Sequence, residues 1–190
     1  DRFYRVQNER NDTIIFGTVK GLEKVYGIDL LINAFANFLS KQKSANAELH
    51  IYGDGTERGF LLEQISTLSL TNKVFLKGKI PNEKVPYVLS QMDVFCMLSR
   101  MESFGVSVVE ASACELPVIA SNVGGLVEVV ENGVTGFLVD PHSGEVVDKM
   151  ALLAQDSKLR KKLGLAGREL VEKKYSWSEN VKSMTKHYEL

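Results

Sequence analysis

This sequence of 190 residues contains few of the residue types that mark several common kinds of site. It has two cysteines, Cys96 and Cys114, and three scattered histidines, which give no metal-ligand spacing. Both cysteines lie in apolar stretches and are expected to be small buried hydrophobes. The net charge is −1, which offers no electrostatic footprint for nucleic acid. No apolar stretch approaches the length of a membrane span. We therefore expect no metal and no nucleic-acid partner.

Short apolar runs alternate with helical patterns along almost the whole chain. This alternation predicts an α/β fold, a doubly wound, Rossmann-like parallel six-stranded sheet with right-handed crossovers and C-terminal helices. We expect one domain over 1–190, with a linker-like start over 1–12 and a final helix over 176–190. The expected strands are 13–19, 48–52, 74–77, 94–98, 118–120 and 137–139. The expected helices are 27–40, 56–68, 82–91, 105–116, 126–130, one from 144 onward, and 159–174 interrupted by Gly164 and Gly167. Thr56 can cap the second of these helices, and Val146, Val147, Met150 and Leu153 form one face of the helix from 144 onward.

The stretch from Met92 to Asn122 is the most informative part of the chain. An apolar run predicts a buried strand, a polar break follows, and a helix opens at Gly105. Val106, Val109, Ala113 and Leu116 repeat at helical spacing and are expected to form its buried face. Pro117 ends the helix before the next strand.

The loop before this helix has the features of an anion site. Ser103 can cap the helix by accepting from a first-turn amide, and Gly105 lets a phosphate approach the backbone. The first-turn amides carry the positive end of the helix dipole. Glu102 lies in the loop, and Glu110 lies about five residues into the helix, where it could accept ribose hydroxyls from a nucleoside diphosphate. Two acids near a helix start can also favour the dipole and bind nothing.

Five ordered motifs resemble those of retaining glycosyltransferases of the GT-B fold, family 4. Two glutamates separated by seven residues, with Phe104-Gly105 after the first, resemble the signature of that family. The other four motifs follow the family's order across nearly the whole chain; they are Leu49-His-Ile-Tyr-Gly-Asp-Gly, Val74-Phe-Leu-Lys-Gly-Lys-Ile, Pro117-Val-Ile-Ala-Ser-Asn-Val-Gly-Gly-Leu-Val-Glu128 and Asn132-Gly-Val-Thr-Gly-Phe-Leu-Val139. The resemblance covers the carboxyl-terminal, donor-binding half of such an enzyme.

The resemblance assigns roles to the residues that match its motifs. It places the donor's diphosphate on the amides of Phe104, Gly105 and Val106 and the ribose on Glu110. Glu102 would lie beside the transferring sugar.

Two lysines follow the first strand, where open parallel sheets bind ligands. The family has an arginine after the strand's glycine and a lysine six residues later, both on the diphosphate. Lys24 matches that lysine. Thr18 occupies the arginine position, which is a departure, and Lys20 is a candidate for the missing charge. Both lysines can equally be solvated loop residues.

Two glycine turns complete the implied site. The resemblance brings the backbone at Gly53 close to the donor and uses the backbone after Gly78 to bind the nucleobase, with Ile80 covering the base. Each turn is also compatible with an ordinary connection between a strand and a helix.

The resemblance implies the donor-binding domain of an enzyme that transfers a hexosyl group from an NDP-sugar, UDP- or GDP-linked, to a glycan or lipid-linked acceptor. It implies no metal, a bacterial polysaccharide or glycolipid pathway, and an acceptor held by an N-terminal domain that this sequence lacks. Without that half, the chain should not transfer sugar. With no signal peptide, we expect a cytoplasmic location; any membrane association would run through the missing domain. A sugar-nucleotide epimerase of the same architecture and a non-catalytic nucleotide-binding domain remain alternatives.

Overall fold

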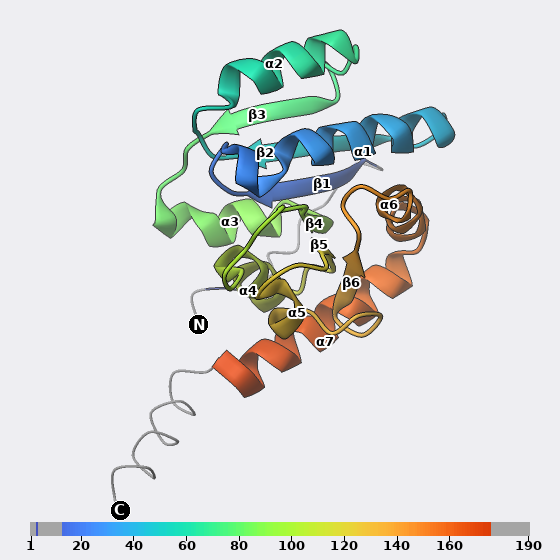
Figure 1. Ribbon diagram of the computed structural model, residues 1–190. Coiled ribbons are helices and arrows are strands. Elements are labelled where there is room, and N and C mark those ends of the chain that lie inside the picture. Colours follow the sequence, from blue (N-terminus) through green and yellow to red (C-terminus); the bar gives the residue numbers. More distant parts are fainter. Residues whose placement is uncertain (1–2, 4–12, 176–190) are drawn as a thin grey trace, which may run out of the picture.

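Six parallel strands form one continuous sheet in the computed structural model, which describes Phe3 and residues 13–175 (Figure 1). The strands run in the order β3-β2-β1-β4-β5-β6, and every neighbouring pair is parallel. The predicted doubly wound, Rossmann-like sheet is therefore confirmed. The strands are β1 Ile14–Val19, β2 Ala47–Tyr52, β3 Val74–Gly78, β4 Val94–Met97, β5 Val118–Ser121 and β6 Gly136–Val139.

Helices follow each strand, close to where the sequence predicts them. The linker-like start, apart from Phe3, and the final helix over 176–190 lie outside the described residues. None of the helices in the described part of the chain is long and apolar enough to cross a membrane. The helices are η1 Lys24–Tyr26, α1 Ile28–Lys41, α2 Arg58–Thr67, η2 Asn82–Lys84, α3 Val85–Ser90, α4 Val106–Ala113, α5 Leu126–Val129, α6 Glu145–Gln155 and α7 Ser157–Tyr175.

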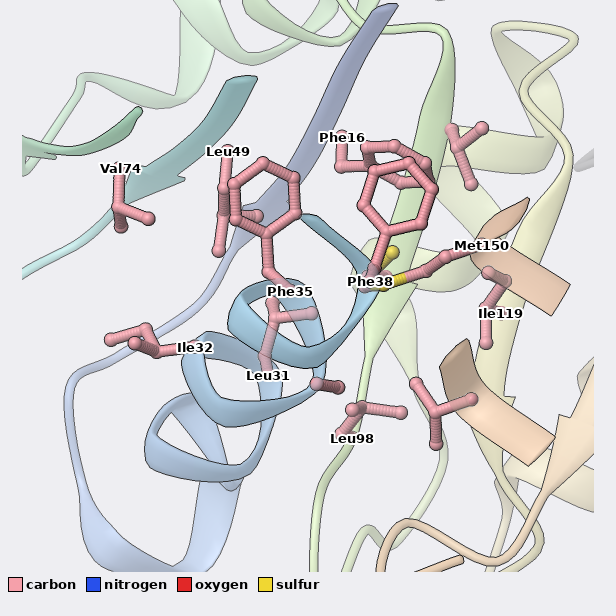
Figure 2. Packing of buried hydrophobic residues seen from close by; sticks show 14 of the residues in the cluster. Phe16, Leu31, Ile32, Phe35, Phe38, Leu49, Val74, Leu98, Ile119 and Met150 are labelled. Atoms are coloured by element: carbon pink, nitrogen blue, oxygen red, sulfur yellow. The ribbon is translucent and has the colours of Figure 1, made fainter. Parts of the chain in front are cut away.

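One hydrophobic cluster lies between the sheet and helices α1, α2 and α6. Its centre is aromatic: the ring of Phe16 on β1 meets those of Phe35 and Phe38 on α1 edge-on, at centroid distances of 6.0 and 5.4 Å. Figure 2 shows these rings among Leu49, Met150 and other buried side chains. The apolar face predicted for α6, which includes Met150, is buried as expected.

A second cluster lies on the opposite face, against α3, α4 and α5. Both faces of the sheet are thus covered, as a doubly wound arrangement requires. Of the four residues at helical spacing, Leu116 is buried, Val109 and Ala113 are partly buried and Val106 is 61% exposed. Val108 and Ala111, which the spacing did not select, are fully buried.

The last helix is continuous, and the predicted interruption at its two glycines is wrong. Helix α7 runs for 19 residues, and Gly164 and Gly167 are buried within it. A Cβ at Gly164 would lie 2.0 Å from the carbonyl oxygen of Glu115, and one at Gly167 would lie 3.3 Å from Cβ of Ser112. These glycines therefore allow α7 to pack closely against the end of α4.

Candidate functional site

The strand order reverses between β1 and β4, and the loops that follow these two strands turn to opposite faces of the sheet. Helix α1 follows β1 on one face and α4 follows β4 on the other. In open parallel sheets this reversal leaves a crevice at the carboxyl ends of the strands, where ligands bind. Both loops carry residues that the sequence singled out, so this edge of the sheet is the candidate site.

The predicted anion site at the start of α4 has its backbone in place, but not its predicted cap. Helix α4 begins after Gly105, whose φ of 97° is left-handed and whose absent side chain leaves room for Leu126. Within the described residues no side chain caps this helix, so the cap expected from Ser103 is wrong. Glycine supplies the required geometry itself, and the first-turn dipole remains.

Two serine hydroxyls lie at the ends of the loop between β4 and α4. The Oγ atoms of Ser99 and Ser107 are buried and have no hydrogen-bond partner in the part of the chain that the structure describes. Buried polar groups in proteins almost always have such a partner. Unpaired hydroxyls here are therefore consistent with a loop that is completed by a ligand or by rearrangement.

The loop of residues 101–104 rests on the two glycines before α5. The amide of Gly125 donates to the carbonyl oxygen of Glu102 at 2.9 Å. Cβ atoms at Gly124 and Gly125 would lie 2.0 and 2.3 Å from the carbonyl oxygens of Glu102 and Ser103. The sequence predicts a flexible turn at this Gly-Gly pair, and the structure shows in addition that the pair allows a close backbone approach.

Glu102 is paired with Lys20 across the crevice. Lys20 Nζ donates to Glu102 Oε2 at 2.6 Å, and the two side chains are 18% and 9% exposed. The ammonium also lies 4.1 Å from the ring centroid of Tyr26, a cation–π distance. Thr18, in the family's arginine position, is 1% exposed on β1. Lys20, two residues further along the chain, is the charged residue that meets Glu102, and its role as a replacement for the family's arginine stays a prediction.

Lys24, the lysine matched by motif, makes different contacts. Its Nζ lies 3.6 Å from Asp29 Oδ2 and 5.2 Å from the ring centroid of Phe60, and its side chain is 62% exposed. Arg100 fixes the backbone here, donating from Nη1 to the carbonyl oxygen of Lys24 at 2.7 Å. The structure thus brings Lys20, and not Lys24, onto Glu102.

Arg100 and Asp29 form a two-pronged ion pair that the sequence did not reveal. The Nη1 and Nη2 atoms of Arg100 donate to Asp29 Oδ1 and Oδ2 at 2.8 and 2.7 Å. Burial alone would raise the pKa of Asp29, but the hydrogen bonds and charge of Arg100, the charge of Lys24 and the amide of Leu30 outweigh it and hold that pKa below its usual value. The same ion pair raises the pKa of Arg100. This pair ties the loop after β4 to the start of α1.

The remaining predicted binding residues lie around the same edge. Glu110 is on α4, partly buried, and Phe104 meets Tyr175 edge-on at a centroid distance of 5.6 Å. Gly53 donates to the carbonyl oxygen of Gly78 at 2.9 Å, which joins the two glycine turns. Ile80 is partly buried against the second cluster.

An open cavity of about 690 Å³ lies beside Gly53. It is lined by Gly21, Glu23, Gly53, Asp54, Gly55, Thr56 and Lys79. Thr56 was predicted to cap α2, but its hydroxyl and its amide both donate to Glu23, which lowers the pKa of that carboxyl. The predicted cap is therefore wrong, and Thr56 instead closes the loop after β1 onto the loop after β2.

Across Phe3 and residues 13–175, no group of three or more His, Cys, Asp or Glu residues is arranged to hold a metal ion. The expectation of a metal-free site stays a prediction.

The doubly wound sheet is the architecture expected for one half of a GT-B glycosyltransferase, and the family comparison agrees. Residues 1–170 match the model of the family described as glycosyl transferases group 1. The chain belongs to this family. The predicted resemblance is therefore confirmed, while the finer assignment to family 4 remains a prediction.

Two curated relatives are similar over most of this chain. N-acetyl-alpha-D-glucosaminyl L-malate synthase from Bacillus anthracis is 32% identical over 87% of the chain and 42% of its own length. The capsular polysaccharide biosynthesis glycosyltransferase CapM from Staphylococcus aureus is 33% identical over 89% of the chain and 45% of its own length. The chain therefore spans less than half the length of these relatives.

A solved structure matches the chain nearly end to end. The C-terminal domain of the glycosyl transferase group 1 family protein LpcC from Francisella tularensis has a TM-score of 0.79 and 25% identity. The match covers 92% of this chain and 96% of that one. The fold is therefore that of a C-terminal GT-B glycosyltransferase domain.

Proposed function

We propose that this chain is the donor-binding domain of a glycosyltransferase and holds a nucleoside-diphosphate sugar in the crevice between β1 and β4. The observation that carries the proposal is the partly buried Lys20–Glu102 pair beside the first turn of α4. A cation, a helix N-terminus and a carboxylate lie together there, and they are the groups that would bind a diphosphate and sugar hydroxyls. Family membership and the names of the relatives support transfer rather than the isomerase alternative.

Each part of the donor has a candidate partner at this edge. The diphosphate would lie on the amides of Phe104, Gly105 and Val106, with lysine charge from the loop after β1. The ribose would lie on Glu110. The base would lie beyond it, near Gly78 and Ile80.

These groups are suited to departure of the nucleoside diphosphate. Negative charge develops on the diphosphate as the bond to the sugar breaks. Fixed amides and a lysine aimed at that charge stabilise the transition state more than the ground state. The positive charge in this proposal comes from the protein, and no metal is required.

Calorimetric titration of UDP, GDP and ADP into this chain tests the proposal. We expect one of them to bind, and Glu110→Ala to weaken that binding by about 1.5–3 kcal/mol, the value of a charge-assisted hydrogen bond. Glu128→Ala is the matched control, because it removes an exposed carboxylate from α5. Absence of binding by all three nucleotides, or equal loss in both variants, would contradict the donor-domain assignment.

The activity of the whole protein is a further proposal. We propose a retaining hexosyltransferase of family 4 that acts on a glycan or lipid-linked acceptor at the inner side of a bacterial membrane. The acceptor would be held by a domain in the part of the relatives that this chain does not span. We expect the 190-residue chain alone to transfer no sugar to an acceptor. Transfer detected in an assay with a radiolabelled donor would contradict this.

A further inference from the structure

The Lys20–Glu102 pair is held in place from both sides of the crevice. The amide of Lys20 donates to the carbonyl oxygen of Tyr52 at 2.9 Å, and its own carbonyl oxygen occupies the space that a Cβ at Gly53 would need. The carbonyl oxygen of Glu102 accepts from Gly125. With both backbones fixed, and an Nζ–Oε2 distance of 2.6 Å, the side chains have little freedom to separate without a replacement partner.

A diphosphate in the proposed site would need the same ammonium group. Glu102 and the first turn of α4 belong to one short segment, so an anion at that helix start lies close to the carboxylate that holds Lys20. Two anions and one ammonium then meet in a poorly solvated space. If Lys20 bonded both anions there, each anion would keep only part of its charge-assisted hydrogen bonding, at a cost in free energy.

Lys24 is not an equivalent donor for this exchange. It is turned toward Asp29 and Phe60, its side chain is 62% exposed, and its carbonyl oxygen is fixed by Arg100. Lys20 is the lysine that is both largely buried and already in contact with the carboxylate beside α4.

We propose that Glu102 holds Lys20 in the empty site as a stand-in for the diphosphate, and that the bound diphosphate takes the ammonium over from Glu102. This rests on the proposed donor-binding function. In the complex with an intact NDP-sugar, the hydroxyls of the sugar replace Lys20 as partners of Glu102. Once the sugar has been transferred, Glu102 has no partner, reclaims Lys20 and weakens the hold on the nucleoside diphosphate. The exchange therefore favours release of the product over retention.

The test is a titration of UDP, GDP and ADP, without sugar, into wild type and Glu102→Gln. Glutamine keeps the size of the side chain but loses the charge that competes for Lys20. We expect the nucleotide to bind about fivefold more tightly to Glu102→Gln, the equivalent of about 1 kcal/mol for a largely desolvated ion pair. Glu128→Gln removes a charge from α5, which also packs against the 101–104 loop, and is expected to leave the affinity unchanged.

The double variant Lys20→Met/Glu102→Gln separates exchange from simple repulsion. Methionine keeps an unbranched apolar stem beside Tyr26, and no carboxylate remains to repel the ligand. Any loss of affinity relative to Glu102→Gln alone therefore measures the contact between Lys20 and the diphosphate. We expect a loss of about tenfold or more, as for a charge-assisted hydrogen bond. Circular dichroism of each variant verifies that the fold is retained.

The outcomes distinguish this exchange from the donor-binding function itself. Binding to wild type that does not tighten in Glu102→Gln, or a double variant equal to Glu102→Gln, would overturn the exchange and leave the donor domain intact. Binding to Glu102→Gln alone would support the exchange in a stronger form. If no nucleotide bound to either protein, both the exchange and the donor-binding function would be wrong.

Discussion

At the scale of single residues, the Asp29–Arg100 pair is the contact whose effect on stability depends most clearly on pH. The pKa of Asp29 is lower in the folded chain than in the unfolded chain, where it is about 3.9. Its contribution is therefore complete above that pH and is lost as the pH falls through the lower, folded value. We expect Asp29→Asn to lower the free energy of unfolding at pH 7 by about 1–3 kcal/mol.

Urea titrations of wild type and Asp29→Asn at several pH values measure this effect. The difference between them should shrink as the pH falls from about 4 through the lower, folded pKa, because Asp29 is protonated first in the unfolded chain and then in the folded chain. Asp148→Asn is a suitable control, since its carboxylate is 73% exposed and lies 3.8 Å from Lys41. Such surface pairs contribute about 0–1 kcal/mol. A difference for Asp29→Asn that stayed constant down to pH 2 would contradict the argument.

Gly124 is expected to be hard to replace by any other residue. Its φ is 47°, and an added Cβ would lie 2.0 Å from the carbonyl oxygen of Glu102. Gly133 is also left-handed, at 78°, but an added Cβ there would meet no atom within 4 Å in the described structure. Gly133→Ala should therefore cost only about 1 kcal/mol of backbone strain, and Gly124→Ala about 2–4 kcal/mol.

Thermal unfolding of the two variants, followed by circular dichroism, gives the comparison. The same midpoint for Gly124→Ala and Gly133→Ala would mean that backbone conformation alone matters. Nucleotide binding by Gly124→Ala should also weaken, because the 101–104 loop cannot keep its position.

The sequence singled out residues at this edge of the sheet but not their contacts. Glu102 and Gly105 were singled out by a local motif, and Lys20 by its place after the first strand. The contact between Lys20 and Glu102 was not predicted, since it joins positions 82 residues apart and depends on β1 and β4 being neighbours. The cap expected from Thr56 was missed because Thr56 donates to Glu23, 33 residues away, which no local pattern reveals.

At the scale of secondary-structure elements, α4 shows where periodicity was insufficient. Apolar or small residues occur on every side of this helix, so several faces fit a helical repeat. The structure buries Val108, Ala111 and Ser112 and exposes Val106. One side of α4 is buried by α7, through Gly167 against Ser112. These two residues are about fifty positions apart in the chain, so a local repeat cannot reveal the contact.

Glycine in a helix usually lowers stability, but Gly164 in α7 should behave in the opposite way. In Gly59→Ala on α2 the new Cβ would meet no described atom within 4 Å, so helix propensity should stabilise the chain by about 0.5–1 kcal/mol. In Gly164→Ala the Cβ would lie 2.0 Å from the carbonyl oxygen of Glu115. We expect a loss of about 2 kcal/mol or more.

Chemical denaturation of this pair of variants would separate propensity from packing. Stabilisation by both substitutions would show that α7 can move away from α4 without loss. Destabilisation by both would show that the assumed propensity gain is absent in α2.

At the scale of the whole molecule, one sheet carries a hydrophobic cluster on each face, so both clusters should unfold together. Phe35→Ala removes a fully buried ring from the cluster under α1 and should cost about 3–5 kcal/mol. We expect wild type and Phe35→Ala each to unfold in a single transition.

Two tryptophan probes can test this cooperativity. Phe60→Trp on α2 and Tyr87→Trp on α3 place exposed reporters beside helices on opposite faces of the sheet. Equal urea midpoints for the two reporters in the Phe35→Ala background would support one cooperative unit. A lower midpoint on the α2 side would show that the two faces unfold separately.

The fold class followed from the sequence because strands and helices alternate without a break. Runs such as the one that became β4 are short, apolar and bounded by turns, which leaves few other interpretations. The order of the strands is a different matter. The order depends on whether each new strand joins one edge of the growing sheet or the other, and no local pattern within a strand shows which edge it joins.

The strand order has one mechanical consequence. The sheet consists of two three-stranded halves that join only where β1 meets β4, and that ladder is short, pairing Phe16 with Val94 and Gly17 with Phe95. Side-chain contacts flank this ladder at both ends: Asp93 accepts a hydrogen bond from the amide of Ile15, and Lys20 donates one to Glu102. The ion pair thus adds a side-chain contact across the shortest ladder of the sheet. A ligand that separates Lys20 from Glu102 would therefore remove one of the two side-chain contacts that flank this ladder.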